Sequence, residues 1–537
     1  MNVLQCLLLA LFGSVSALFS PWLMHAGWLT LGRPLIAGTV VGLILGDLTT
    51  GILLGCAVQT LYIGLVTPGG SMPADVNYVA WIGIPLTMIV KADAAFALAL
   101  SPALSFLGVL ATLLTVTINS FFVHRQDSLI GRGKLESAMR IPIIGQVSNF
   151  IVRFFPIFLF NYFGQGLVQQ LYESIPIEVI GILAGFGNVL PLVGFAILLK
   201  LICKRNFDLI YYLVGFVLVA VMKFPIVPVL IFAALFAYLD FRYSASDEQA
   251  VVTPLIAKPE KTEERLLNKK DVFSCCTSWV LWNLSVQNLE RMQAPAVIRM
   301  VGLVKDKLYP NDREKQQALL ARHEPFFNTE PFLGSIVPGV ILGMEEENAR
   351  SQQGVPDELI AGVKTALMGP MAGIGDSLYI GTLIPILLAI AIGMSSSSGS
   401  IVGPLFYIVA HLGIMMPVTW LLFFQGYNMG LSAATTILGG GIKDRITQAM
   451  SIVGLTIVGA ITCEYVTIRT GWVMMQGEEV MLDMNAALDG IFPNVITLLL
   501  ALLVYWLMAK KNVKIGWMFL LLFVFAVVAL LTGLMAL

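Results

Sequence analysis

Residues 364–386 read KTALMGPMAGIGDSLYIGTLIPI, and this stretch decides the fold we expect. It is apolar and almost uncharged, yet several residues that disfavour a regular helix interrupt it: Gly369, Pro370, Gly373, Gly375 and Gly381. A membrane tolerates such breaks only where the freed backbone groups are buried in protein or line a watery cavity. A broken helix with one carboxylate at the break, here Asp376, is typical of a transporter's substrate site. The alternative is a kinked helix whose glycines allow close packing.

The composition is that of an integral membrane protein. The 537 residues are 57% hydrophobic and only 12% charged, whereas soluble domains carry about 25% charged residues. We therefore expect an all-α, polytopic helical bundle with broken or re-entrant helices. A formal net charge of −1 gives no reason to expect a nucleic-acid partner. The six cysteines show no CxxC spacing, so we expect neither a metal site nor a cofactor.

A change of composition divides the chain into two membrane halves. Apolar runs extend to residue 243, and residues 244–272 are polar and charged before long apolar runs return. We predict a membrane domain at 1–243, a cytoplasmic linker at 244–272 and a second membrane domain at 273–537. The Lys/Arg bias of membrane-protein loops predicts that the basic loop 124–140 lies on the cytoplasmic side of the membrane. The acidic loop 478–489 is predicted to lie on the outer side. Residues 1–17 lack a positive start, so we expect an uncleaved first segment in place of a signal peptide.

Each half contains one segment that we expect to be re-entrant. Residues 325–344 are apolar between two charged flanks of cytoplasmic character, which implies a dip into the membrane and back. Residues 51–77 are interrupted by glycine and proline and carry Gln59, Asp75 and Asn77 at membrane depth. Paired, interrupted segments of this kind indicate a binding site between two halves. We find no convincing residue-level repeat.

The signatures of other chemistries are absent from the sequence. No GxxxxGK[ST] phosphate-binding loop is present, which argues against an ATP-driven pump, and no HExxH zinc motif is present. The histidines are candidates for phosphoryl carriers or proton relays: His25, His124, His323 and His411. We expect none of them to carry a phosphoryl group, because a solvated or hydrogen-bonded histidine is the commoner case.

Polar residues at membrane depth provide the candidate site. The motif QNLERMQ at 287–293 places Glu290 and Gln293 on one helical face. We predict that Glu290, Gly373, Gly375 and Asp376 shape the site. We predict substrate contacts from both halves: Gln59, Asp75, Asn77, Asn288, Gln293 and Asn328. The alternative is that several of these groups only cap helix ends.

These motifs resemble a known family. LERMQ (289–293), HEPFFNTEPF (323–332), EEE (345–347) and LMGPMAGIGDSLYIGTLIPI (367–386) resemble the IID membrane subunit of mannose-family (mannose/fructose/sorbose) phosphotransferase systems. The first half resembles the partner IIC subunit through RPLIAGTVVGLILGDLTTGILLG (33–55) and the broken segment after it. The chain therefore looks like a IIC–IID fusion.

The resemblance implies a function. Such a permease binds a sugar outside and moves it by an elevator-like motion, and a separate IIB protein, loaded by IIA, phosphorylates it inside. The resemblance also implies a multi-pass protein of the bacterial inner membrane, a homotrimer of the fused chain, and phosphohistidines on the partners instead of on this chain. One departure concerns Gln59, where mannose-type IIC subunits carry a glutamate, and this puts mannose itself in doubt as the substrate.

Two other functions remain open from the residues alone. One is an ion- or proton-coupled secondary transporter of a small polar solute, with Asp376 and Asp75 as coupling sites. The other is a passive channel. Neutral, hydroxyl-rich sugars need amides and a few carboxylates for recognition, and the sequence contains no chain of buried acids typical of proton coupling.

Overall fold

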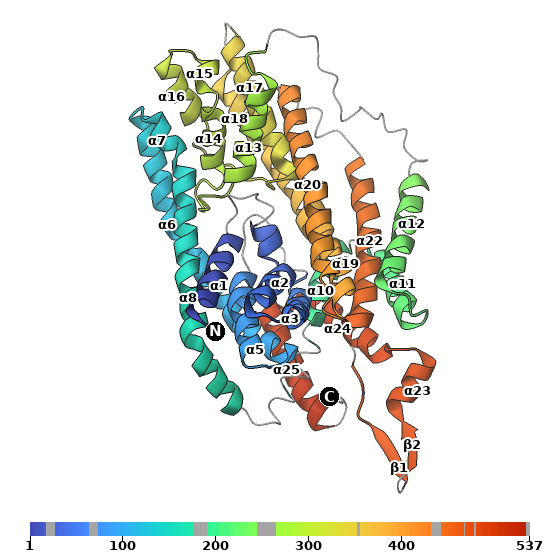
Figure 1. Ribbon diagram of the computed structural model, residues 1–537. Helices are drawn as coiled ribbons and strands as arrows, with labels where there is room; N and C mark the ends of the chain where they lie inside the picture. The colour runs from blue at the N-terminus through green and yellow to red at the C-terminus, as the bar shows by residue number, and fades with distance from the viewer. Residues whose placement is uncertain are drawn as a thin grey trace.

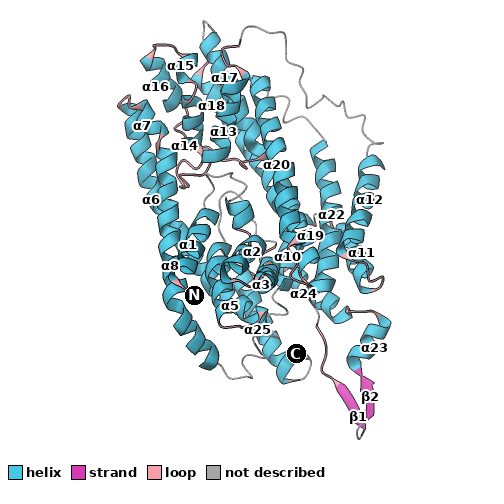
Figure 2. Ribbon diagram, viewed as in Figure 1, coloured by secondary structure: helices cyan, strands magenta, loops and turns pink. Residues whose placement is uncertain are grey.

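The computed structural model is helical over nearly all of the chain that it describes, which confirms the all-α prediction (Figures 1 and 2). It describes residues 1–17, 27–63, 74–174, 182, 186, 189, 191–203, 205–243, 265–351, 355–430, 442–466, 468–476 and 479–532. The strands β1 (Val473–Gln476) and β2 (Glu479–Asp483) form a small antiparallel hairpin that the sequence did not predict. Figure 1 shows this hairpin at the opposite end of the molecule from α15 and α16.

The first half begins with short helices packed beside two very long ones. Its elements are α1 (Val3–Ser16), η1 (Gly27–Leu31), α2 (Pro34–Leu45), α3 (Leu48–Leu61), α4 (Val76–Tyr78), η3 (Val79–Gly83), α5 (Ile84–Ile89), α6 (Ala94–Gly131), α7 (Leu135–Met139), α8 (Ile141–Ser174), α10 (Pro191–Ile202), η4 (Asn206–Asp208), α11 (Leu209–Ala220) and α12 (Ile226–Tyr243). Figure 1 shows α6 and α8 side by side along one flank, joined by α7 at one end.

The second half starts with short helices and ends with long apolar ones. Its helices are α13 (Lys269–Trp282), α14 (Ala294–Gly302), α15 (Lys305–Leu308), α16 (Arg313–Ala321), η5 (Leu333–Ser335), α17 (Ile336–Arg350), α18 (Asp357–Gly375), η6 (Asp376–Leu383), α19 (Ile384–Ser395), α20 (Val402–Met429), α22 (Ile442–Tyr465), α23 (Met484–Ile491), α24 (Val495–Ala509) and α25 (Ile515–Leu531).

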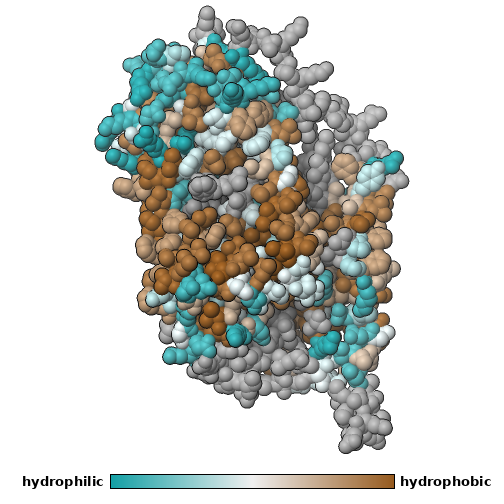
Figure 3. All heavy atoms as spheres, in the orientation of Figure 1, coloured by the Kyte–Doolittle hydropathy of each residue, from teal (hydrophilic) through white to brown (hydrophobic). Residues whose placement is uncertain are grey.

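The surface has the layering of a membrane protein. By length and composition, four of the described helices can cross a membrane: Ala94–Gly131, Leu135–Gly166, Asp357–Ser395 and Val402–Met429. A fifth crossing is possible if α23 and α24, bent by 78° at a short break, act as one span. Figure 3 shows a hydrophobic band across the middle and a hydrophilic end over α7, α15 and α16, which we call the polar end. The basic loop 124–140, predicted inside, lies at this end.

The expected break in residues 364–386 takes the form of a change in helix type. The helix is continuous from Asp357 to Ser395, but η6 is a π-helix, in which the N–H of Ile384 bonds the carbonyl of Tyr379. Pro385 follows directly, and a proline has no N–H and clashes with the carbonyl four residues before it. The π-helix η3 similarly precedes Pro85, and η1 lies just before Pro34. Such π-helical turns are frequent at functional sites.

The segment 325–344 doubles back on itself. Its two flanks meet, because Arg322 donates to Glu345 (2.6 Å) and His323 Nε2 lies 3.0 Å from the same carboxylate. Between them an extended stretch descends to η5 and α17 returns. This geometry is that of the predicted re-entrant segment. In the corresponding segment of the first half, residues 64–73 with their glycine and proline break lie outside the described residues.

The two halves contact each other at the polar end through ion pairs. His124 pairs with Glu290 at 3.0 Å, and Arg291 pairs with Asp127 at 3.2 Å. Glu290 is exposed, and it joins the end of α6 to the second half. Exposed pairs of this kind each contribute about 0–1 kcal/mol. They orient the surfaces more than they stabilise the fold.

The end of the predicted linker belongs to the folded second half. Residues 244–264 lie outside the described residues, but the N–H of Leu267 donates to Glu346 (2.9 Å). The hydroxyl of Tyr427 donates to the other oxygen of Glu346, and Arg265 lies over the Tyr427 ring at 4.6 Å. Asn268 then caps α13. The chain is therefore fixed from residue 265 onward, seven residues before the predicted boundary at 272.

A buried His–Glu pair stands beneath the polar end. His323 and Glu345 are both fully buried, and Arg322 contacts the same carboxylate. Burial lowers the pKa of His323 below its usual value, although the neighbouring Glu345 acts in the opposite direction. Burial alone would raise the pKa of Glu345, but the hydrogen bonds and charges of His323 and Arg322 outweigh it and lower that pKa.

We predict that His323→Gln flattens the pH dependence of stability. Because the folded pKa of His323 lies below its unfolded value of about 6.5, the unfolded state takes up protons first and stability falls as pH drops through that value. Glutamine still offers an N–H to Glu345 but does not titrate. Thermal unfolding of the purified chain from about pH 8 to pH 5.5 measures the slope. His124→Gln, at an exposed position, is the matched control, and a slope that His323→Gln leaves unchanged contradicts the prediction.

Candidate functional site

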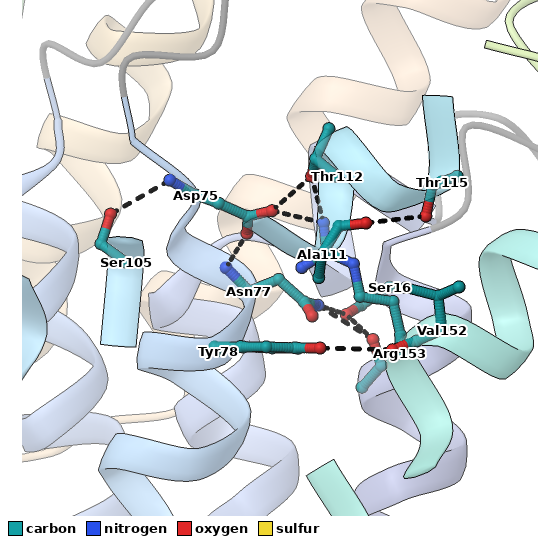
Figure 4. A network of polar contacts seen from close by, with 11 residues as sticks. Ser16, Asp75, Asn77, Tyr78, Ser105, Ala111, Thr112, Thr115, Val152 and Arg153 are labelled. Atoms are coloured by element: carbon teal, nitrogen blue, oxygen red, sulfur yellow. Dashed lines mark hydrogen bonds and ion pairs between the residues drawn. The ribbon is translucent and has the colours of Figure 1, made fainter. Parts of the chain in front are cut away.

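Asp75 and Arg153 form an ion pair in the interior of the first half (Figure 4). Asp75 caps the start of α4, where its Oδ1 accepts from the N–H of Asn77 at 2.8 Å. Its Oδ2 accepts from the guanidinium of Arg153, which comes from the middle of α8, and from Thr112 of α6 at 3.0 Å. The pair thus joins the loop before α4 to both long helices. Asp75 is fully buried and Arg153 is 5% exposed.

Arg153 has hydrogen-bonding capacity beyond this pair. Its Nη2 lies 2.5 Å from Thr112 Oγ1, and its guanidinium stands over the ring of Tyr78 at 5.1 Å. Its Nη1 is buried and has no hydrogen-bond partner among the described residues. A buried donor without a partner is costly, so it marks a place for water or a ligand.

Asn77 and Gln59 each have a buried side-chain oxygen that accepts no hydrogen bond from a described residue. The amide nitrogen of Asn77 donates to the carbonyl of Gly13 (2.9 Å) and to the hydroxyl of Ser16 (2.7 Å). Its Oδ1 and the Oε1 of Gln59, in α3, are buried without a partner in the described part of the chain. These predicted contacts therefore retain unused hydrogen-bonding atoms.

A small cavity lies beside Arg153 at the contact between the halves. It is lined by residues of the first half and by one of the second: Ala17, Trp28, Thr112, Thr115, Asn149, Arg153 and Gln287. Its volume of about 10 Å³ holds one water molecule and nothing larger. A sugar is larger than this cavity, so its walls would have to separate to admit one.

In the second half, the residues predicted to contact the substrate use their side-chain polar groups mainly to form hydrogen bonds with the backbone. Gln293 forms two bonds with Thr329, donating to its carbonyl at 2.8 Å and accepting from its N–H at 2.9 Å. Asn288 accepts from the N–H groups of Glu290 and Arg291 and so closes a turn. The predicted helical face over 287–293 is therefore wrong, because these residues form turns before α14. Gln293 thereby holds the loop that carries Asn328, which is half-buried.

The structure brings Asp75 and Asn77 together, but no hydrogen bond between described residues joins the three first-half contacts to the three second-half ones. Gln287, next to Asn288, lines the cavity instead. Sequence reasoning missed Arg153, Thr112 and Gln287. A signal existed for Arg153, since it is a lone basic residue within the apolar run 141–163.

A second acidic group, Glu330, lies against the glycine-rich helix. Its buried carboxylate accepts N–H groups of Phe332 (3.0 Å) and Leu333 (2.6 Å). A Cβ at Gly375 would overlap the side chain of Glu330, whereas a Cβ at Gly373 would meet open space. Asp376 is half-buried and begins η6. Of the two predicted site-shaping glycines, Gly375 alone is in such close contact.

A buried aromatic cluster forms another contact between the halves. His411 of α20 bonds Tyr379 of η6 at 2.6 Å and Thr30 of η1 at 3.4 Å. Tyr407 donates to the carbonyl of Leu29 at 2.6 Å, and its ring stacks on that of His411. The π-helices η1 and η6, one from each half, are thus linked through a single histidine.

The fold defines a multi-pass α-helical membrane protein, with a small polar cavity at the contact between its two halves. Family models match both halves: "PTS system sorbose-specific iic component" over residues 3–239 and "PTS system mannose/fructose/sorbose family IID component" over residues 266–535. The chain therefore belongs to the mannose/fructose/sorbose family of phosphotransferase-system permeases, with IIC and IID components fused in one chain.

Individual relatives match one half each. The mannose-specific EIID component of Escherichia coli K12 is 31% identical over 263 residues, which cover 48% of this chain and 91% of the relative. The fructose permease IIC component of Bacillus subtilis 168 is 27% identical over 227 residues, covering 42% and 82%. A cryo-EM structure of the mannose transporter ManYZ with microcin E492 is 30% identical and covers 51% of this chain and all of that chain, but its TM-score of 0.30 is too low to support a structural argument.

We predict opposite effects for alanine at the two glycines. Gly375→Ala should destabilise the protein, because its Cβ overlaps the constrained Glu330 side chain. Gly373→Ala is the matched control: it has free space, and alanine favours a helix by about 1 kcal/mol over glycine. Thermal unfolding of both variants in the same detergent measures the difference. Equal effects of the two changes would show that the Glu330 contact is unimportant.

We predict that Arg153→Met destabilises the protein by about 3–5 kcal/mol, because it leaves the Asp75 carboxylate buried without its cation. Adding Asp75→Asn should recover a large part of this loss, since no net charge then remains buried. Unfolding of the parent, both single variants and the double variant gives the coupling energy. Strictly additive losses would contradict a coupled pair.

Proposed function

We propose that the chain binds a sugar between its halves and delivers it by an elevator-like motion to the cytoplasm, where a separate IIB subunit, loaded by IIA, phosphorylates it. The family supplies the class of reaction. The chain contributes binding and passage, and the phosphoryl-carrying residues belong to the partners.

The observation that carries this proposal is the chemistry of the cavity between the halves. Its polar lining consists of hydroxyls, amides and one arginine whose charge Asp75 already balances. Hydroxyl and amide groups bond the hydroxyls of a neutral solute. Ion coupling through Asp75 is disfavoured, because a cation would have to displace Arg153. The transported solute is therefore neutral and hydroxyl-rich.

Within this site we assign different roles to the predicted residues. Gln59 and Asn77 contact the sugar through their unused acceptors, and Asn328 contacts it from the second half. Asp75 orients Arg153, which donates through its free Nη1. Asn288 and Gln293 hold the backbone that presents Gln287 and Asn328. Glu330 and Gly375 set the position of the π-helix η6.

The proposal also includes the setting of the protein. The polar end faces the cytoplasm and receives IIB, consistent with its basic loop at 124–140. The protein lies in the bacterial inner membrane as a homotrimer, with membrane domains at 1–243 and 273–537, and residues 265–272 of the segment between them are held by the second half.

An uptake experiment tests the proposal. Cells or vesicles containing the chain, IIB, IIA and their phosphoryl donor are offered labelled hexoses, ketoses and hexosamines. We predict accumulation of at least one sugar as its phosphate, abolished when IIB or the donor is omitted and retained with an uncoupler. Loss with the uncoupler alone would indicate an ion-coupled transporter, and equilibration without any donor would indicate a channel.

A further inference from the structure

The long helix α6 is polar on its buried face and apolar on its exposed face. Its exposed positions include Phe106, Leu113 and Phe121. Its buried polar residues recur every three or four positions, or after seven, and so follow one face: Ser101, Ser105, Thr112, Thr115, Asn119 and Gln126. This stripe runs from the level of Asp75 toward the polar end.

Helix α8 carries a matching stripe. Gln146, Asn149 and Arg153 are buried and spaced i, i+3, i+7, so they share a face. The two stripes meet where Arg153 bonds Thr112 at 2.5 Å, and Ser148, beside Asn149, donates to Asn119 at 2.8 Å. Both stripes border the cavity through Thr112, Asn149 and Arg153.

Helix packing is enough to explain the presence of these buried polar stripes on α6 and α8. Ser101 and Thr115 donate to carbonyls of their own helix, as such hydroxyls commonly do. Small polar residues also allow close helix contacts in membranes. A further observation is needed to indicate a ligand.

Gln146 provides that observation. It is 5% exposed, and both its amide oxygen and its amide nitrogen lack a hydrogen-bond partner among the described residues. An apolar side chain of the same shape would be as stable or more stable there. The amide is therefore costly as it stands, and this cost is understandable if the amide bonds a solute that passes.

Gln146 lies just beyond the cavity on the side of the polar end. It precedes Arg153 by about two helical turns, or about 10 Å along the axis. The adjacent Gly145 packs tightly on the second half, where a Cβ would lie 2.7 Å from Val286. The backbone carbonyl of Ser285 accepts a hydrogen bond from Asn149 (3.4 Å). The side-chain hydroxyl of Ser285 is also buried, without a partner in the described chain.

We propose that the facing polar stripes of α6 and α8 line the path of the sugar from the cavity toward the polar end, and that the Gln146 amide binds sugar hydroxyls in transit. This inference rests on the proposed function. It assigns Gln146 to passage and the groups around Arg153 to initial binding, with Ser285 and Val286 of the second half packed against α8 at Asn149 and Gly145.

The test compares Gln146→Leu with the parent in three measurements on the full chain. Uptake with IIB, IIA and donor should fall about three- to thirty-fold, the range expected for losing one or two hydrogen bonds during passage. Binding of the transported sugar to purified protein without IIB should be unchanged, and thermal stability should be unchanged or higher. Gln165→Leu removes an amide from the other end of α8, where Gln165 bonds Met1 and Asn161, and is a control for uptake whose stability is measured alongside.

The remaining outcomes contradict the inference. Unchanged uptake with raised stability would mean that the amide binds only water. Uptake and stability that fall together would indicate a packing role, and Gln146→Met, an unbranched apolar replacement, repeats the comparison if the leucine variant does not fold. Absence of uptake by the parent for every sugar would overturn the proposed function itself, so the two failures are distinguishable.

Discussion

The interior of the first half is arranged around two charges that have to stay together. Asp75 and Arg153 are both buried, and either charge alone would be strongly unfavourable there. Their pairing holds the loop before α4 against α6 and α8, and η3 continues directly from α4. The cavity, the free Nη1 of Arg153 and the contact with Gln287 of the second half all depend on this position.

Buried backbone N–H and carbonyl groups, like the two buried charges, need bonding partners inside the protein. Pro34, Pro85 and Pro385 each remove a donor, and a π-helical turn precedes each of them. His411 then links η1 to η6 across the halves. The π-helices η1 and η6, the hydroxyls of Tyr379 and Tyr407 and the polar cavity therefore lie along the contact between the halves, where lipid does not reach them.

Composition and motifs were sufficient to predict the helical membrane fold, the two halves and the doubling back of residues 325–344. They also selected Asp75 and Asn77, whose contact with a sugar stays a prediction. They did not identify the partner of Asp75, because Arg153 is remote in sequence and its pairing depends on how α8 packs. Likewise, Gly373 and Gly375 look equivalent in the sequence, and only the packing of Glu330 distinguishes them. The periodicity of the sequence shows which residues share a helix face. Which residue each of them contacts across the fold is known only from the structure.

The anchoring of residues 265–267 has a consequence for how such a gene fusion arises. Glu346, Tyr427 and Asn428, which hold Arg265 and Leu267, all belong to the second half. That half therefore fixes its own beginning, whatever precedes it. Because these contacts do not involve residues before 265, we expect insertions or deletions there to leave α13 in place. The length of the joining sequence can therefore change during evolution. One translated chain meanwhile supplies both components in equal numbers.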